Sequence, residues 1–192
     1  MNNTDMEKIE NEIAYRNSLL EAARSGQRLS ADERYWLSTH SAFSTRYGYP
    51  YLSMDILALS PEVKYNITVR LISSCSNHTL TPTFSVPHGK GHIQWTRQDG
   101  ATKKAKMLST ANSKDEPVSC FSFKSEQGLM AVSYHYKTRD HRGAEFWNSS
   151  TIDDRLAMKK TAVKENEVIY SCTDIDGDDF DKYVFSVSWE AC

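Results

Sequence analysis

A period-two alternation of apolar and polar residues recurs along the C-terminal two thirds of the chain and limits its fold more than any other feature. In Val63–Ile72, apolar side chains occupy every second position from Val63 to Leu71. This pattern is typical of a β-strand with one face in a core and the other in water. Similar runs occur at Thr79–Val86, His92–Arg97, Cys120–Phe123, Leu129–Tyr136, Glu167–Cys172 and Tyr183–Trp189.

Clusters of turn-forming residues separate these runs, among them HGKGH, RQDG, SEQG and TRDHRG. Many short strands with no long helix between them indicate an all-β domain, and we predict an antiparallel β-sandwich of about eight or nine strands. The stretch Ser150–Glu165 breaks the pattern. We expect a helical turn or an irregular crossing there.

The N-terminal part of the chain has a helical pattern instead. Thr4 and Glu7 have the spacing of a capping box, and Ile9, Ile13 and Leu20 recur on one helical face up to Gly26. Ser30 with Glu33 marks the start of a second, shorter helix. We therefore divide the chain into a helical N-terminal extension, residues 1–56, and a β-sandwich, residues 57–192.

Composition and charge disfavour several classes of function. The 23 basic and 25 acidic residues give a net charge of −2, so no basic surplus points to nucleic acid. No apolar stretch is long enough to span a membrane. The N-terminus lacks the apolar core of a secretory signal, so we expect synthesis in the cytoplasm and leave later export open. In that compartment, the four widely spaced cysteines are expected to be buried thiols rather than disulfides.

No arrangement of residues suggests catalysis. Ser133 lies close to His135, but no nucleophile elbow surrounds the serine, and its neighbours alternate as an ordinary strand does. We expect that the protein is not an enzyme.

The most distinctive motif is TDIDGDDFDK, Thr173–Lys182, which places five aspartates within eight residues. Clustered carboxylates repel one another, and a calcium ion relieves the repulsion because it accepts six to eight oxygen ligands. The spacing differs from that of an EF-hand. An exposed hairpin turn made of favourable turn residues explains the composition equally well, so both interpretations stay open at this point.

Two segments together resemble the small calcium-dependent fucose- and mannose-binding bacterial lectins. Leu59–Ser76 resembles the first strand of that family, which ends in a small polar turn, and Asp174–Cys192 resembles the closing acidic loop and last strand. The resemblance implies that Asp176, Asp178, Asp179 and Asp181 are candidate calcium ligands. It also implies that Ser73, Ser74 and Cys75 match the turn that contacts the sugar.

The family pattern is incomplete in this chain. Lys182 occupies the position of the last carboxylate of the family loop, and Ile72 occupies that of a strand-end asparagine. The resemblance therefore implies one calcium ion or none rather than two. In that family the terminal carboxylate completes the calcium site of a dimer mate, which makes Cys192 a further candidate ligand and predicts a homodimer.

Two classes of function follow from the sequence. The first is a lectin-like protein that binds carbohydrate, with calcium or by direct contact with the sugar hydroxyls. The alternative is a non-catalytic interaction or inhibitor module that has lost sugar binding and uses its helices as a contact arm. Function belongs to sites rather than to folds, so the choice depends on how the acidic loop is built.

Overall fold

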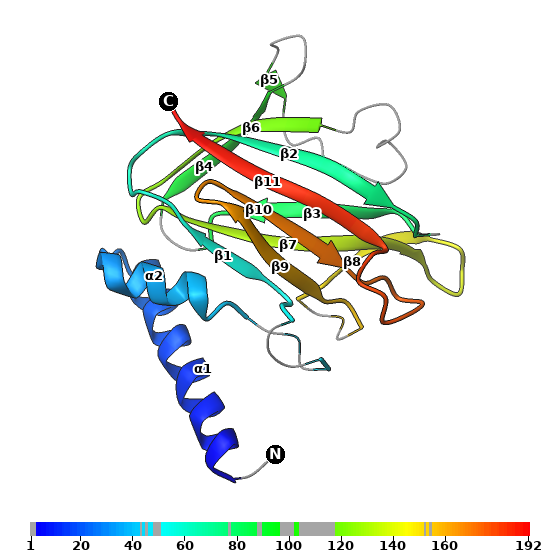
Figure 1. Cartoon of the computed structure of the whole chain (residues 1–192), viewed down its shortest axis with the longest axis horizontal. Coiled ribbons are helices and arrows are strands. Elements are labelled where there is room, and N and C mark those ends of the chain that lie inside the picture. Colours follow the sequence, from blue (N-terminus) through cyan, green and yellow to red (C-terminus); the bar gives the residue numbers. More distant parts are fainter. Residues whose placement is uncertain are drawn as a thin grey trace.

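The structure, a computed structural model, describes residues 3–42, 44, 46–47, 51–76, 78–87, 90–96, 102–103, 118–151, 153 and 155–192. In these residues two N-terminal helices precede eleven strands, and the strands form two antiparallel sheets (Figure 1). The smaller sheet has the order β1-β7-β3, and β8 also pairs with β7. Its strands are β1 (Asp55–Ala58), β3 (Leu80–Ser85), β7 (Leu129–Arg139) and β8 (Glu145–Ser149).

The larger sheet has the order β5-β4-β6-β2-β11-β10-β9. Its strands are β2 (Tyr65–Ser74), β4 (Gly91–Thr96), β5 (Thr102–Lys103), β6 (Val118–Ser125), β9 (Met158–Lys164), β10 (Glu167–Cys172) and β11 (Tyr183–Ala191). The last strand, β11, therefore lies between β2 and β10 inside the sheet, where both of its edges are paired.

One hydrophobic core fills the space between the two sheets. Met130, Val132 and Tyr134 of the smaller sheet share this core with the apolar side chains of β2, β6, β10 and β11. Two tyrosines also cross the core with hydrogen bonds: the Tyr134 hydroxyl donates to the Thr173 carbonyl (3.0 Å), and the Tyr170 hydroxyl donates to the Asp55 carboxylate. The predicted antiparallel β-sandwich is confirmed, although the described residues form eleven strands where eight or nine were expected.

The helices pack on the outer face of the smaller sheet. Helix α1 spans Asn3–Arg24, and α2 spans Ala31–Thr39 with the predicted capping box at Ser30. Leu29 and Leu37 share a second apolar cluster with Ile56 of β1 and Leu129 of β7. Leu19 is the first residue of α1 that belongs to this cluster. The N-terminal half of α1 projects away from the sheets (Figure 1).

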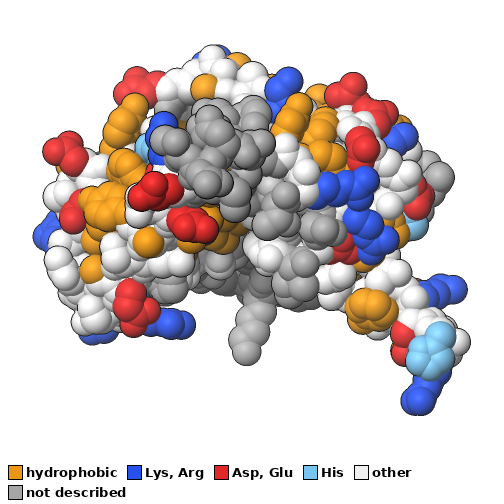
Figure 2. Space-filling view, turned by 90° about the horizontal axis from the view of Figure 1, so that it is seen from below, with side chains coloured by type: hydrophobic (Ala, Val, Ile, Leu, Met, Phe, Trp, Pro, Cys, Tyr) orange, Lys and Arg blue, Asp and Glu red, His pale blue; other side chains and the backbone are white. Residues whose placement is uncertain are grey.

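A buried side chain holds the link between the helices against the sandwich. The Gln127 side chain accepts a hydrogen bond from the Leu29 amide (3.0 Å) and donates one to the Gln27 carbonyl (2.7 Å). Charges of both signs are interspersed over the lower face of the molecule (Figure 2). Within the described residues, no helix has the length and apolar character needed to cross a membrane.

Three parts of the fold differ from the sequence-based expectation or were not anticipated. The expected helical turn or irregular crossing in Ser150–Glu165 is wrong only for the second half of this stretch: the described residues before Met158 are irregular, and Met158–Lys164 forms β9, an edge strand. Strand β8 was missed because Phe146 and Trp147, its adjacent aromatic residues, are both exposed. Strand β1 begins at Asp55, so the sandwich extends two residues before the expected boundary.

The cysteines are free thiols, but the expectation that they are buried is correct only for Cys172. Burial raises the pKa of the Cys172 thiol well above its ordinary value. Cys75, Cys120 and Cys192 are exposed. Cys75 follows the end of β2 and Cys192 follows β11, so both lie beyond the part of each strand that faces the core.

Candidate functional site

The acidic loop connects β10 to β11 at one end of the larger sheet, and its first aspartate anchors it. Asp174 is almost completely buried, at 2% exposure. One of its carboxylate oxygens accepts the Asp176 amide (3.0 Å), and the other accepts the Ser76 hydroxyl (2.8 Å). Asp174 therefore fixes the shape of the loop and ties it to the end of β2, which leaves the later aspartates to face water.

The end of β2 lies beside this loop because of the strand register. Ser73 pairs with Val184, and Ser74 pairs with Tyr183, across β2 and β11. The register shifts between Val184 and Phe185, which leaves Ile72 as the extra residue of a β-bulge on β2. A bulge bends the strand that carries it, and here it lies immediately before the exposed serines.

Cys75 joins the strand end directly to the acidic loop. Its amide donates to the Lys182 carbonyl (3.0 Å), and its thiol donates to the Asp181 carbonyl (3.3 Å). Ser73, Ser74 and Cys75 are all exposed. The structure thus brings the two segments that carry the family resemblance together, although about 100 residues of chain separate them.

Three of the four candidate calcium ligands direct their carboxylates to different partners. Asp176 pairs with the His78 imidazole (2.8 Å), and Asp178 accepts hydrogen bonds from the Tyr47 hydroxyl and from Arg46 (3.3 Å). Asp179 accepts the Asp181 amide (3.0 Å), and its carboxylate lies 3.6 Å from the Lys182 ammonium. Cationic or neutral donors therefore offset most of the repulsion that a calcium ion would otherwise relieve.

In this arrangement the donor set does not fit a cation. Within the described part of the chain, no three His, Cys, Asp or Glu side chains lie close enough together to hold a metal ion. Cys192 lies at the far end of β11, where its amide donates to the Lys64 carbonyl (2.9 Å). A nine-residue strand separates it from the loop by about 30 Å, so Cys192 can approach an acidic loop only on a second copy of the chain.

Aromatic side chains cover one side of the acidic loop. Tyr51 stacks on Phe180 with their ring centroids 4.6 Å apart, and Tyr47 packs edge-on to the same ring at 5.7 Å. Sequence reasoning missed Tyr47, Tyr51, Arg46 and His78 as parts of the site. The dense aromatic run around Tyr47–Tyr51 was the available signal, because a short segment this rich in aromatics must pack against another part of the fold.

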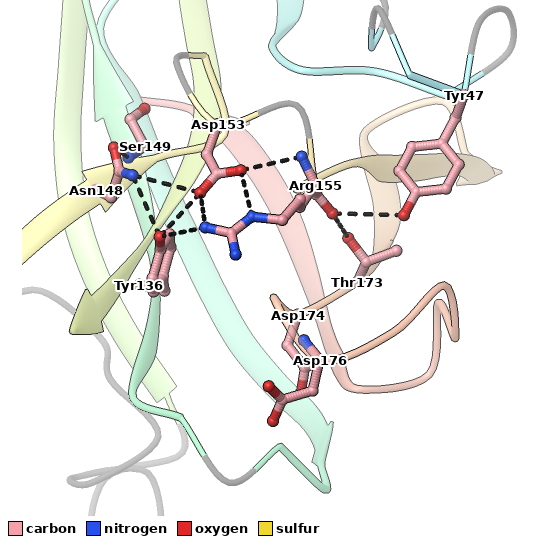
Figure 3. A network of polar contacts seen from close by, with 9 residues as sticks. All are labelled: Tyr47, Tyr136, Asn148, Ser149, Asp153, Arg155, Thr173, Asp174 and Asp176. Atoms are coloured by element: carbon pink, nitrogen blue, oxygen red, sulfur yellow. Dashed lines mark hydrogen bonds and ion pairs between the residues drawn. The ribbon is translucent and has the colours of Figure 1, made fainter.

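A second polar network lies beside the start of the acidic loop (Figure 3). Asp153, whose side chain is only 7% exposed, accepts hydrogen bonds from the Arg155 guanidinium (2.7 Å) and the Tyr136 hydroxyl (2.8 Å). Hydrogen bonds from Arg155 and Tyr136 lower the pKa of Asp153 to about 2. Desolvation of the carboxylate acts in the opposite direction but is the weaker effect. The Arg155 carbonyl then accepts the Thr173 hydroxyl (3.1 Å), which joins this network to the start of the acidic loop.

We call the exposed assembly of Ser73–Cys75, His78, Tyr47, Tyr51 and Asp176–Lys182 the loop site. It presents carboxylate acceptors, hydroxyl groups, an imidazole and aromatic rings on one end of a rigid sandwich. Among the loop-site aspartates that form ion pairs, Asp178 and Asp176 have the most exposed side chains, at 65% and 59%. Such an assembly can bind a polar ligand through several weak, directional contacts. No nucleophile with an activating base is present among its described residues.

Comparisons with known proteins found similarity only at the level of structure. No protein-family model matches the chain, and no curated protein is significantly similar to it in sequence. Among solved structures, it is similar to the Chromobacterium violaceum lectin CV2L, solved in complex with α-methyl-fucoside. The two share 14% identity over 70% of this chain and 95% of that one, with a TM-score of 0.37.

Two further bacterial lectins show the same degree of similarity. The high-affinity mannose-binding lectin of Ralstonia solanacearum is 11% identical over 70% of this chain and 95% of its own, with a TM-score of 0.37. The C-terminal domain of the BC2L-C lectin from Burkholderia cenocepacia is 15% identical over 70% and 94%, with a TM-score of 0.36. All three of these solved structures are bacterial lectins, and each is similar to this chain at low identity.

Proposed function

We propose that the protein is a non-catalytic lectin-like protein that binds carbohydrate at the loop site. The observation that carries this proposal is the meeting of Ser73–Cys75 with the exposed aspartates of the acidic loop. Sugar hydroxyls both donate and accept hydrogen bonds, so they require acceptors and donors on one surface. Asp176 and Asp178 supply charged acceptors, while the serine hydroxyls supply donors.

Recognition at this site uses direct contacts to sugar hydroxyls. Hydrogen bonds to a carboxylate are stronger than those between neutral groups, since the acceptor is ionised. The ring pair of Tyr51 and Phe180 adds an apolar surface against which the C–H face of a sugar ring can pack. Asp174 and the Asp153 network hold the loop in place, so the ligand does not have to order it.

A glycan array followed by calorimetry on the full chain tests this proposal. We expect Asp176→Asn and Asp178→Asn to weaken binding of the best array ligand about tenfold or more, because each removes a charged acceptor from an exposed site. Asp32→Asn is the matched control, since Asp32 is an exposed aspartate in the first turn of α2, outside the loop site. Absence of any array ligand, or equal affinity in all three variants, would contradict carbohydrate binding here.

Calcium-assisted binding is the alternative to direct recognition, and a melting experiment decides between the two. If a calcium ion gathers the aspartates, it stabilises the fold by about 2.7 kcal/mol at a hundredfold excess over its dissociation constant. Asp181→Ala should then abolish the shift in melting temperature. Lys182→Asp should enlarge the shift, because it replaces the ammonium that neutralises Asp179. An unchanged melting temperature in both wild type and Lys182→Asp would leave only direct recognition of hydroxyls.

One observation favours the second candidate function, an interaction module that uses the helices as its contact arm. The N-terminal half of α1 projects from the sandwich (Figure 1), and Tyr15 on α1 is 45% exposed. Substitutions in the loop site would leave binding of a protein partner through this arm unchanged. Removal of residues 1–14 would abolish it and preserve the apolar cluster that begins at Leu19.

A further inference from the structure

A groove lies at the end of the sandwich opposite the loop site. Figure 1 shows α2, the turn between β9 and β10, and the end of β11 on the same side of the molecule. These elements and the chain after β1 line an open groove of about 840 Å³. We call this space the α2 groove; its lining residues are Ala31, Arg34, Tyr35, Ala58–Ser60, Tyr65, Glu165, Asn166 and Trp189–Ala191.

The α2 groove exists because the helices pack against the sandwich. Leu37 and Leu29 fix α2 to the smaller sheet, and the Arg34 guanidinium donates to the Leu29 carbonyl (2.6 Å). The opposite wall is equally well held: the Asn166 side chain donates to the Trp189 carbonyl (3.1 Å), and the Trp189 amide donates to the Asn166 carbonyl (3.1 Å). Both walls are therefore rigid before any ligand arrives.

The lining combines aromatic rings with hydrogen-bonding groups. Tyr35 is 69% exposed on the helical wall, and Trp189 packs partly against the core on the strand wall. Glu165 and Glu190 are exposed and supply carboxylate acceptors. Their two negative charges, set against Arg34, leave the groove with one net negative charge, which disfavours an anionic ligand.

We propose that the α2 groove is a second binding site that takes a short, neutral oligosaccharide. Aromatic rings pack against the C–H faces of sugar rings, and carboxylates accept hydrogen bonds from their hydroxyls. An extended peptide is the competing occupant that the test must exclude, because β1, whose Ala58 lines the groove, is an edge strand of the smaller sheet. The strand wall is closed to such pairing, since Ala191 pairs with Tyr65 and Ser188 pairs with Glu167.

Titration of the full chain with three neutral trisaccharides tests this site: maltotriose, cellotriose and N,N′,N″-triacetylchitotriose. We expect at least one of them to shift the NMR resonance of the Trp189 indole N–H in a saturable manner. Tyr35→Ala and Glu190→Gln should each weaken that binding about tenfold, because they remove an aromatic wall and a charged acceptor. Both positions are exposed, and circular dichroism checks that the variants fold.

Control variants separate this site from the loop site. Phe146→Ala removes an aromatic side chain that is 45% exposed on β8, outside the groove, and should leave trisaccharide binding unchanged. Asp176→Asn should also leave it unchanged, even if it abolishes binding at the loop site. The proposal fails if none of the three sugars shifts the Trp189 resonance, or if the groove variants bind as wild type does. It also fails if Asp176→Asn removes the shift, or if a heptalysine peptide shifts Trp189 and the sugars do not.

Discussion

The ion pair between Asp153 and Arg155, next to the start of the acidic loop, leads to a quantitative prediction about stability. The Asp153 carboxylate accepts four hydrogen bonds shorter than 3.1 Å, three from Arg155 and one from the Tyr136 hydroxyl. These contacts favour the ionised form and lower the pKa of Asp153 from 3.8 to about 2. A shift of just under two units corresponds to about 2.5 kcal/mol of folding stability when the carboxylate is ionised.

The sign of the pH dependence follows from the lowered pKa. The unfolded chain binds a proton at Asp153 more readily than the native protein does, so acid favours unfolding. The stabilisation is complete above the unfolded pKa, near pH 4, and is lost as the pH falls toward 2. Asp153→Asn should therefore lower the free energy of unfolding by about 2.5 kcal/mol at neutral pH, and the deficit should shrink as the pH approaches 2.

Urea unfolding followed by circular dichroism, repeated from about pH 7 down to about pH 2, measures this difference. Glu10→Gln provides the control, because Glu10 is an exposed carboxylate on α1, away from this network. The control should follow the wild type throughout. A variant with wild-type stability at neutral pH would refute the reasoning, as would a deficit that persists undiminished at the acidic end.

Three further predictions concern the fold and the assembly. Gly128→Ala should lower the melting temperature sharply, because Gly128 has a φ of +68° and an added Cβ would lie 2.2 Å from the Leu59 carbonyl oxygen. Leu37→Ala should cost about 2–5 kcal/mol in urea unfolding, since Leu37 is fully buried where α2 meets the sandwich. Sedimentation should show a homodimer whose assembly weakens when residues are added after Cys192; a monomer at tens of micromolar would contradict the dimer.

The sequence alone determined the elements whose signals are local. The alternation in Val63–Ile72 predicted β2, because side-chain direction in a strand depends only on position along the chain. Ser30 and Glu33 predicted the start of α2, because a capping box involves groups three residues apart. Edge strands carried a weaker signal: most side chains of β9 are exposed, and so are the aromatic side chains of β8, so neither strand shows an apolar alternation.

The tertiary structure decided which residues make up the candidate site. Pairing of β2 with β11 placed Ser73–Cys75 beside the acidic loop, and no local pattern specifies that register. The same packing brought Tyr47 and His78 to Asp178 and Asp176 and left Cys192 at the opposite end of β11. Composition shows how many carboxylates a loop contains. Which charges and hydroxyls they meet depends on contacts between residues far apart in the sequence, and only the folded chain fixes those contacts.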